Sequence, residues 1–339
     1  MQTWFVTGGA GFIGSAFVQL VLNERPDVRV VNYDALTYAG NIENLAGLDP
    51  ERHSLIHGDI CDADAVIKAI PQDAELIVNF AAESHVDRSI LSAREFIRTN
   101  VLGTQILLDA AREKGVRRFC QISTDEVMGS LPEDSQDVFT EASPFAPNSP
   151  YAASKASAEH LVRAAHETFG LDVVITRCGN NYGPRQFPEK FIPLMIANAL
   201  ADENIPVYGD GMNVRDWIYA DDHCRAILDV IDSGTSGGVY NIGARNERRN
   251  IDVVKSVLDA LGKPHSLIRF VEDRPGHDRR YAIDPAKIES ELGWHPIESW
   301  QSGIEKTIRW YIENPDWTQH VRTGAYREYY ERQYGMRIA

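Results

Sequence analysis

Gly8-Gly-Ala-Gly-Phe-Ile-Gly14 is the stretch of sequence that indicates the fold. It follows an apolar run over residues 3–7 that predicts a strand, and it precedes a helical spacing of apolar residues at Phe17, Leu20 and Val21. The glycines permit a tight turn and let the backbone approach a pyrophosphate, for which the start of the helix supplies N–H donors. A glycine motif alone is weak evidence. The strand–turn–helix order around it predicts a dinucleotide-binding turn.

Asp34 ends the second predicted strand, over residues 28–33. In dinucleotide-binding folds a carboxylate about 20 residues beyond the glycine motif binds the ribose 2′-hydroxyl of NAD. The same carboxylate would repel the 2′-phosphate of NADP, so the sequence favours NAD. The alternative, a polar residue that only caps the strand, explains the spacing less well.

Strands and helices alternate along the chain as far as Cys178. This alternation predicts an α/β protein with a Rossmann-type, doubly wound parallel sheet. We predict a NAD-binding domain over residues 1–178, to which residues 213–242 return. Residues 179–212 and 243–330 are predicted to form a smaller, mixed α/β lobe that binds the substrate. A long helix is predicted over residues 92–114, with Thr99 and Asn100 interrupting its apolar face.

Composition narrows the class of protein. The chain has 339 residues, of which 43% are hydrophobic, and a formal net charge of −15, which argues against nucleic acid as a partner. Its four cysteines are scattered without metal-ligand spacing, so we expect no metal site and reduced thiols. No signal segment and no apolar run of membrane-spanning length stand out, and we therefore expect a cytoplasmic protein with no membrane partner.

Tyr151 and Lys155 are the first candidate catalytic pair. Ser149 and Pro150 suit the cap and the first position of a helix, so Tyr151 and Lys155 would lie four residues apart on one helix face. A lysine ammonium near the phenol would lower its pKa, so that the phenolate could accept a proton from an alcohol. Taken alone, such a pair is more often an exposed surface feature.

Thr124, Asp125 and Glu126 follow the apolar run over residues 118–122, which predicts a buried strand whose carboxyl end opens into a pocket. Adjacent acids after a strand are commonly a solvated turn. In a closed pocket, however, two neighbouring carboxyls push their pKa values apart, and that separation suits the elimination of water, which needs an acid and a base.

Together these residues resemble the extended short-chain dehydrogenase/reductase superfamily and, within it, the dTDP-glucose 4,6-dehydratase family. Thr-Asp-Glu is the most specific part, because it separates the dehydratases from the related 4-epimerases. The segments that carry the resemblance are Thr7–Gly14, Leu36–Gly40, Ala81–Ser89, Ser123–Val127, Tyr151–Lys155, Asn181–Pro184, Phe187–Lys190, Val214–Trp217 and Arg274–Arg280.

The resemblance implies a mechanism. Tyr151, with Lys155, would deprotonate the C4 hydroxyl of glucose as hydride passes to NAD⁺, and Thr124 would hydrogen-bond that hydroxyl. Glu126 would remove the C5 proton, and a protonated Asp125 would protonate the departing C6 hydroxyl. Hydride would return to C6, giving a 4-keto-6-deoxy sugar.

The motifs and the resemblance also imply the binding residues. For the cofactor, in addition to Tyr151 and Lys155, we predict Gly8, Gly11, Phe12, Ile13, Gly14, Asp34, Leu36, Thr37, Asp59, Ile60, Ala81, Ala82 and Thr99. For the nucleotide sugar, in addition to Thr124, we predict Ser84, His85, Asn180, Asn181, Lys190, Pro206, Val207, Tyr208, Arg215, Asn250, Arg274 and His277.

Three residues depart from the family's usual pattern, namely Met128 for tyrosine, Gly179 for serine and Arg185 for an aromatic residue. They leave the exact nucleotide sugar open, and a related dehydratase acting on another sugar is one alternative. A 4-epimerase and a non-catalytic NAD-binding regulator are the others. The family pairs through helices that correspond here to those starting near Ser92 and Tyr151, so a homodimer is expected.

Overall fold

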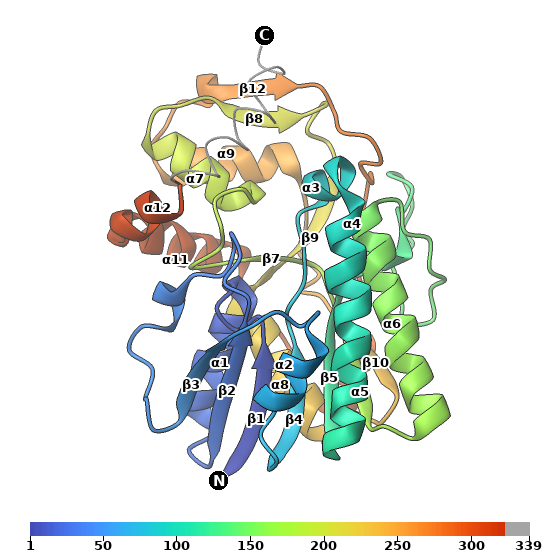
Figure 1. Ribbon diagram of the computed structural model, residues 1–339. Helices are drawn as coiled ribbons and strands as arrows, with labels where there is room; N and C mark the ends of the chain where they lie inside the picture. The colour runs from blue at the N-terminus through green and yellow to red at the C-terminus, as the bar shows by residue number, and fades with distance from the viewer. Residues whose placement is uncertain (323–339) are drawn as a thin grey trace.

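A computed structural model describes residues 1–322 of the chain. Its centre is a seven-stranded parallel sheet in the order β10-β6-β5-β4-β1-β2-β3 (Figure 1). This order confirms the doubly wound α/β fold predicted above, with the strand order reversing between β1 and β4. The strands are β1 (Gln2–Thr7), β2 (Val28–Asp34), β3 (His53–His57), β4 (Ala74–Asn79), β5 (Arg118–Thr124), β6 (Val173–Cys178) and β10 (Gly238–Ile242).

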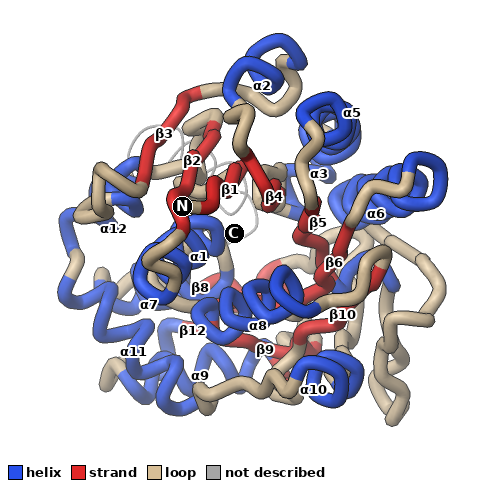
Figure 2. The backbone as a smooth tube through the Cα atoms, turned by 90° about the horizontal axis from the view of Figure 1, so that it is seen from below, coloured by secondary structure: helices blue, strands red, loops and turns tan. Residues whose placement is uncertain are grey.

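Helices cover both faces of this sheet, as Figure 2 shows. On one face, α2 (Ala63–Ala69), α5 (Thr104–Lys114) and α6 (Pro150–Phe169) enclose a core that includes Phe5, Ile77 and Phe119. On the other, α1 (Phe12–Glu24), α8 (Ala220–Ser233) and α10 (Ala286–Leu292) enclose a second core. The inner strands β1, β2, β4, β5 and β6 are buried on both sides, which explains why their sequences are largely apolar rather than alternating.

The helix predicted over residues 92–114 is built from three consecutive segments. α4 (Ala93–Phe96) and α5 are joined by a π-helical segment, Ile97–Gly103, which contains Thr99 and Asn100. The Asn100 side chain exchanges hydrogen bonds with the backbone of Glu83 and also donates to Ser154 on α6. The polar interruption in the sequence therefore marks the place where the helix widens and holds two neighbouring segments.

The smaller lobe contains a three-stranded sheet of β7 (Asn180–Tyr182), β9 (Val214–Tyr219) and β11 (Glu247–Arg249), and a pair of β8 (Ile205–Tyr208) with β12 (Ile268–Val271). Its helices are α7 (Phe191–Leu200), α9 (Asn250–Ala260), α11 (Trp300–Glu313) and α12 (Pro315–Val321). The remaining short elements are α3 (Val86–Leu91) and the 3₁₀ turns η1 (Ile42–Leu45), η3 (Asp125–Met128) and η4 (His265–Leu267).

The segment 213–242 is divided between the two sheets. β9 lies in the three-stranded sheet, whereas β10 pairs with β6 at the edge of the seven-stranded one. The division into domains stays a prediction, and residues 323–330 of the predicted lobe lie outside the described part of the chain. Within residues 1–322, none of the helices combines the length and the apolar character that crossing a bilayer requires.

Candidate active site

A cavity of about 410 Å³ lies at the carboxyl ends of the parallel strands. This is the edge of an open α/β sheet at which ligands bind, close to the reversal of strand order. All the predicted cofactor residues except Leu36 line the cavity, and so do the predicted catalytic residues. The tertiary structure thus brings the glycine turn, the acid pair and the Tyr–Lys pair into one space.

The glycine turn is packed so closely that two of its glycines could not carry a side chain. A Cβ on Gly14 would lie 2.3 Å from the Gly8 carbonyl oxygen, and one on Gly8 would lie 2.6 Å from the Ala81 nitrogen. Gly11 is the N-cap of α1 and offers no side-chain cap, so the first N–H groups of the helix are left for an anion. The turn therefore fits a dinucleotide pyrophosphate.

Asp34 supports this turn as well as facing the cavity. Its two carboxylate oxygens accept hydrogen bonds from the backbone N–H groups of Ala10 and Leu36, each at 2.8 Å. Burial raises the pKa of Asp34, while these two N–H donors oppose the rise. Asn32 accepts a further bond from the Gly9 N–H at 3.1 Å. The end of β2 thus determines the shape of the glycine turn.

Tyr151 and Lys155 lie in the first two turns of α6, which begins as the sequence indicated. The Ser149 hydroxyl accepts the N–H of Ala152, and Pro150 occupies the first helical position. Tyr151 packs edge-on against Phe96 and is 8% exposed, and Lys155 is 5% exposed. The interpretation of the pair as an exposed surface feature is therefore wrong.

The electrostatics of the pair differ from the prediction. Burial raises the pKa of the Tyr151 phenol well above its usual value, and Glu126 adds to the rise. Lys155 does not offset this, because its Nζ donates to the Ile122 carbonyl at 2.5 Å. Burial lowers the pKa of Lys155 from its ordinary 10.5 to about 8, although Glu159 opposes this. Without a ligand, the site favours a protonated phenol.

Lys155 should make stability depend on pH in the ligand-free protein. Because its folded pKa of about 8 lies below the ordinary 10.5, the unfolded chain binds the proton more tightly. The free energy of unfolding should therefore rise with pH between about 8 and 10.5, by about 3 kcal/mol from this group. Urea unfolding across this range should show a smaller rise for Lys155→Met. Lys287→Met is the control, since Lys287 also donates to a strand carbonyl, that of Val239.

Asp125 and Glu126 begin the 3₁₀ turn that follows β5. The Thr124 hydroxyl donates to Asp125 Oδ1 at 3.2 Å and accepts the Glu126 N–H at 3.3 Å. Burial, followed by the charge of Glu126, raises the pKa of Asp125 well above its usual value. Burial also raises the pKa of Glu126, but the cations Arg274 and Arg215 oppose that rise. The two carboxyls therefore differ in the way that an acid and a base require.

The smaller lobe supplies positive charge around Glu126. Arg215 donates to the backbone oxygen of Asp278 at 2.9 Å, and its guanidinium lies 4.2 Å from the centre of the Tyr281 ring. Arg215 is therefore held in the interior, at 5% exposure. Arg279, by contrast, forms ion pairs with Asp210 and Glu133.

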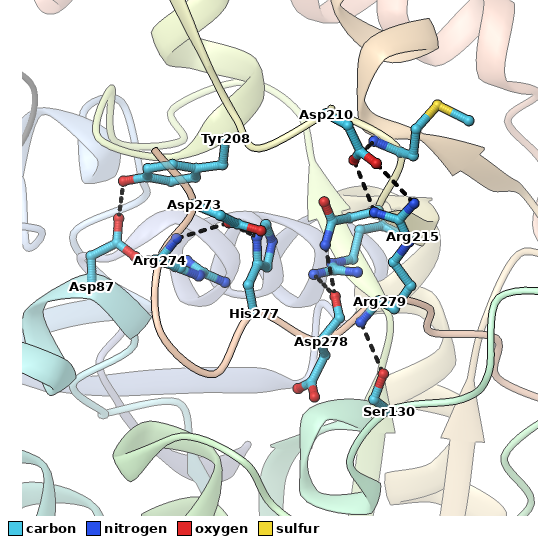
Figure 3. A network of polar contacts seen from close by, with 12 residues as sticks. Asp87, Ser130, Tyr208, Asp210, Arg215, Asp273, Arg274, His277, Asp278 and Arg279 are labelled. Carbon is cyan, nitrogen blue, oxygen red and sulfur yellow. Dashed lines mark hydrogen bonds and ion pairs between the residues drawn. The ribbon is translucent and has the colours of Figure 1, made fainter. Parts of the chain in front are cut away.

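A polar network joins α3 to the smaller lobe, as Figure 3 shows. Asp87 accepts hydrogen bonds from the Tyr208 hydroxyl at 2.8 Å and from Arg274 Nη1 at 2.7 Å. His277 Nδ1 lies 2.6 Å from Asp273 Oδ1. Three residues that were predicted to bind substrate, Tyr208, Arg274 and His277, are thus held in one network.

Of the other residues predicted to bind substrate, some line the cavity and others do not. Ser84, Asn180, Asn181 and Lys190 line the cavity, and Lys190 Nζ donates to the Ser84 carbonyl at 2.6 Å. Val207 is packed in the core of the smaller lobe. The site predictions omitted several charged, amide and aromatic residues that line the cavity: Glu83, Glu95, Arg98, Gln186, Phe187 and Glu189. Two of these, Phe187 and Glu189, lie in the run 187–190, which already carried the family resemblance.

The residues that depart from the family pattern lie around the site. Met128 is buried, and its Sδ accepts a contact from Arg177 Nη1 at 3.7 Å. Gly179 lines the cavity, and a Cβ there would lie 2.7 Å from the Asp216 carbonyl oxygen. Arg185 adopts a left-handed backbone with φ of 66°. A side chain at position 179 would therefore require the chain around Asp216 to move.

Comparison with known proteins gives concordant matches. A family model described as GDP-mannose 4,6 dehydratase matches residues 5–307. The dTDP-glucose 4,6-dehydratase of Xanthomonas campestris is 51% identical over 96% of this chain and 98% of its own. The crystal structure of the dTDP-glucose 4,6-dehydratase DesIV from Streptomyces venezuelae, with NAD and TYD bound, has a TM-score of 0.91 at 51% identity, covering 94% of this chain and all of that one.

The fold is also shared with a 4-epimerase, at lower identity. UDP-glucose 4-epimerase from Thermus thermophilus, solved with NAD, has a TM-score of 0.86 at 30% identity and covers 92% of this chain and 100% of its own. The sequence identity thus separates the dehydratases from the epimerases more clearly than the fold does. The chain belongs to the dTDP-glucose 4,6-dehydratase family of extended short-chain dehydrogenases/reductases.

Proposed function

We propose that the protein is a dTDP-glucose 4,6-dehydratase, a hydro-lyase that uses NAD and forms dTDP-4-keto-6-deoxy-D-glucose. The observation that carries the proposal is the placement of Asp125 and Glu126 beside Tyr151, in a cavity that also contains the dinucleotide turn. An oxidation alone needs no such acid pair, whereas removal of water needs both a proton donor and a proton acceptor. Relatives that are about half identical over nearly their full length support the same activity.

The residues fit NAD. The uncapped start of α1, with its glycines, would hold the pyrophosphate, and Asp34 would bind the ribose hydroxyl. Ala81, Ala82 and Thr99 line the same cavity and would contact the rest of the dinucleotide. When bound, NAD⁺ supplies the acceptor for the hydride that leaves C4 and later returns to C6. Because the cofactor is regenerated in every turnover, we expect it to stay bound.

Gly14→Ala should weaken NAD binding by about tenfold to a hundredfold, since the added Cβ meets backbone atoms that cannot easily move. Titration of the stripped protein with NAD, followed by fluorescence, measures the change. The control is Gly47→Ala, because Gly47 does not line the cavity and a Cβ there meets no atom within 4 Å. Unchanged affinity in Gly14→Ala would place the pyrophosphate elsewhere.

The side chains would act in sequence on the sugar. Tyr151, whose ionised form would be favoured by the positive charge of bound NAD⁺, would then accept the C4 hydroxyl proton while Thr124 hydrogen-bonds the same oxygen. The resulting 4-ketone makes the C5 proton acidic, and Glu126, which the nearby cations help to keep ionised, removes it. Asp125, whose raised pKa keeps it protonated, gives its proton to the C6 hydroxyl, and water leaves. C5 then regains the proton that Glu126 removed, and the hydride that returns to C6 makes it a methyl group.

The substrate diphosphate would bind to the cations of the smaller lobe. Arginine forks suit phosphate oxygens, and Arg215 and Arg274 approach the site from β9 and from the loop after β12. The proposed polar contacts to the substrate are completed by Asn180, Asn181, Lys190, Asn250 and His277. The proposed site for the base and ribose of the nucleotide is lined by Pro206, Val207 and Tyr208. We propose residues 1–178 as the cofactor domain and the smaller lobe as the substrate domain.

We further propose a cytoplasmic homodimer. Leu91, Ile97 and Leu102, on the helical segments from α3 to the π-helical turn, are each at least half exposed, and these segments neighbour α6. Pairing of this surface between two copies would bury them. Light scattering should find a dimer, and Ile97→Glu with Leu102→Glu should give a monomer. A monomeric unmodified protein would contradict the assignment.

Mass spectrometry of the nucleotide sugar tests the activity. Purified protein, with no added cofactor, should convert dTDP-glucose to a product lighter by one water, and UDP- and GDP-hexoses should react more slowly. An unchanged mass with an inverted C4 configuration would identify an epimerase instead. Unchanged dTDP-glucose with turnover of another hexose would redirect the proposal to that sugar and to Gly179 and Met128.

A further inference from the structure

A strap of residues 35–41, between β2 and η1, forms one wall of the cavity. Ala35, Thr37, Ala39 and Gly40 line it, but the side chain between them, Tyr38, does not. The strap is tied down at both ends. The Leu36 N–H donates to Asp34 at 2.8 Å with a strained φ of 48°, and the Asn41 N–H donates to the Ala10 carbonyl at 3.0 Å.

Tyr38 anchors the middle of the strap. The Arg88 guanidinium lies 3.9 Å from the centre of its ring, and the Phe187 ring meets it edge-on at 5.6 Å. The carboxylates of Glu189 and Glu83 lie close enough to its hydroxyl for their charges to act on its pKa. The contacts are therefore both aromatic and polar, and they surround one side chain.

These partners come from two other segments. Glu83 and Arg88 lie after β4 and on α3, and Phe187 and Glu189 lie in the loop before α7. Arg88 Nε donates to Glu189 at 2.9 Å, and the Glu189 side chain is 1% exposed, so the two segments are joined beneath the ring. Burial, with Glu189 and Glu83, raises the pKa of Tyr38 well above its usual value, so the phenol stays a donor.

We propose that Tyr38 is a positioning residue that holds the strap over the bound dinucleotide and so sets how slowly NAD leaves. The inference rests on the proposed use of NAD. The strap is part of the cavity wall beside Asp34 and the glycine turn, so a ligand there can leave more readily if the strap moves. Among the contacts described for Tyr38, only the hydroxyl contacts join the strap to both neighbouring segments through charged groups.

Tyr38→Phe tests the role of the hydroxyl while it keeps the ring. Holoenzyme is diluted into buffer without NAD, and the NAD that remains on the protein is measured by chromatography over time. Loss of the polar contacts between the hydroxyl and these charged groups should speed release by about tenfold. Turnover of dTDP-glucose should fall after dilution and return to the wild-type rate when NAD is added.

Tyr240→Phe is the matched control, because Tyr240 is a buried tyrosine whose hydroxyl also donates to a carboxylate, that of Glu291, at 3.0 Å. It should leave NAD release unchanged. If Tyr38→Phe does not fold, Phe187→Leu removes the edge-on contact and should speed release in the same direction.

Release of NAD at the wild-type rate from Tyr38→Phe, or a lost turnover that added NAD does not restore, would overturn the proposal. These results differ from a failure of the proposed function. In that case the wild-type protein itself would hold no NAD and leave dTDP-glucose unchanged, and both proposals would fall together.

Discussion

Tyr151→Phe should lower the turnover of dTDP-glucose by about a thousandfold while NAD remains bound. The phenylalanine ring keeps the packing against Phe96, so the fold of α6 is retained. What is lost is the only atom of that side chain that can accept the C4 hydroxyl proton. The measurement is the initial rate of water loss by mass spectrometry, together with the NAD content of the purified variant.

Tyr240→Phe serves again as the control, because it removes a buried phenol that does not line the cavity, and it should keep full activity. A Tyr151→Phe variant that turns over at more than about a tenth of the wild-type rate would contradict the assignment of Tyr151 as the base for C4 oxidation, because positioned acid–base groups contribute about a hundredfold or more.

Glu126→Gln should divide the reaction at its second step. The amide cannot accept the C5 proton, so water loss should fall by about a hundredfold to ten-thousandfold. Tyr151 and Thr124 are untouched, so oxidation of C4 should continue for one turnover. The NADH absorbance should then rise to about one equivalent per site and remain, whereas the wild-type enzyme returns the hydride. Stopped-flow absorbance and mass spectrometry of the sugar measure the two effects separately.

Glu95→Gln is the matched control for this experiment. Glu95 also lines the cavity, but it is exposed on α4 rather than placed beside Asp125. The control should eliminate water normally. If Glu126→Gln also turned over normally, another group would have to be the C5 base. If it formed no NADH, Glu126 would be needed before the oxidation.

The sequence alone determined the features that depend on near neighbours in the chain. The spacing of Tyr151 and Lys155 predicts one helix face because the helix has a fixed period, and Ser149 and Pro150 predict where that helix starts. The glycine turn and Asp34 likewise follow from a local strand–turn–helix pattern. The apolar runs predicted the inner strands of the large sheet, since a strand covered on both faces needs no polar alternation.

Only the tertiary structure decided the electrostatics of the site. Arg215 and Arg274 are some 90 and 150 residues from Glu126 in the sequence, yet their charges act on its pKa. Burial in the folded protein also raises the pKa of Tyr151, and the packing of α6 on β5 lets Lys155 donate to the Ile122 carbonyl. Desolvation and Coulomb interactions depend on burial and on distances through space, and neither quantity is specified by spacing along the chain.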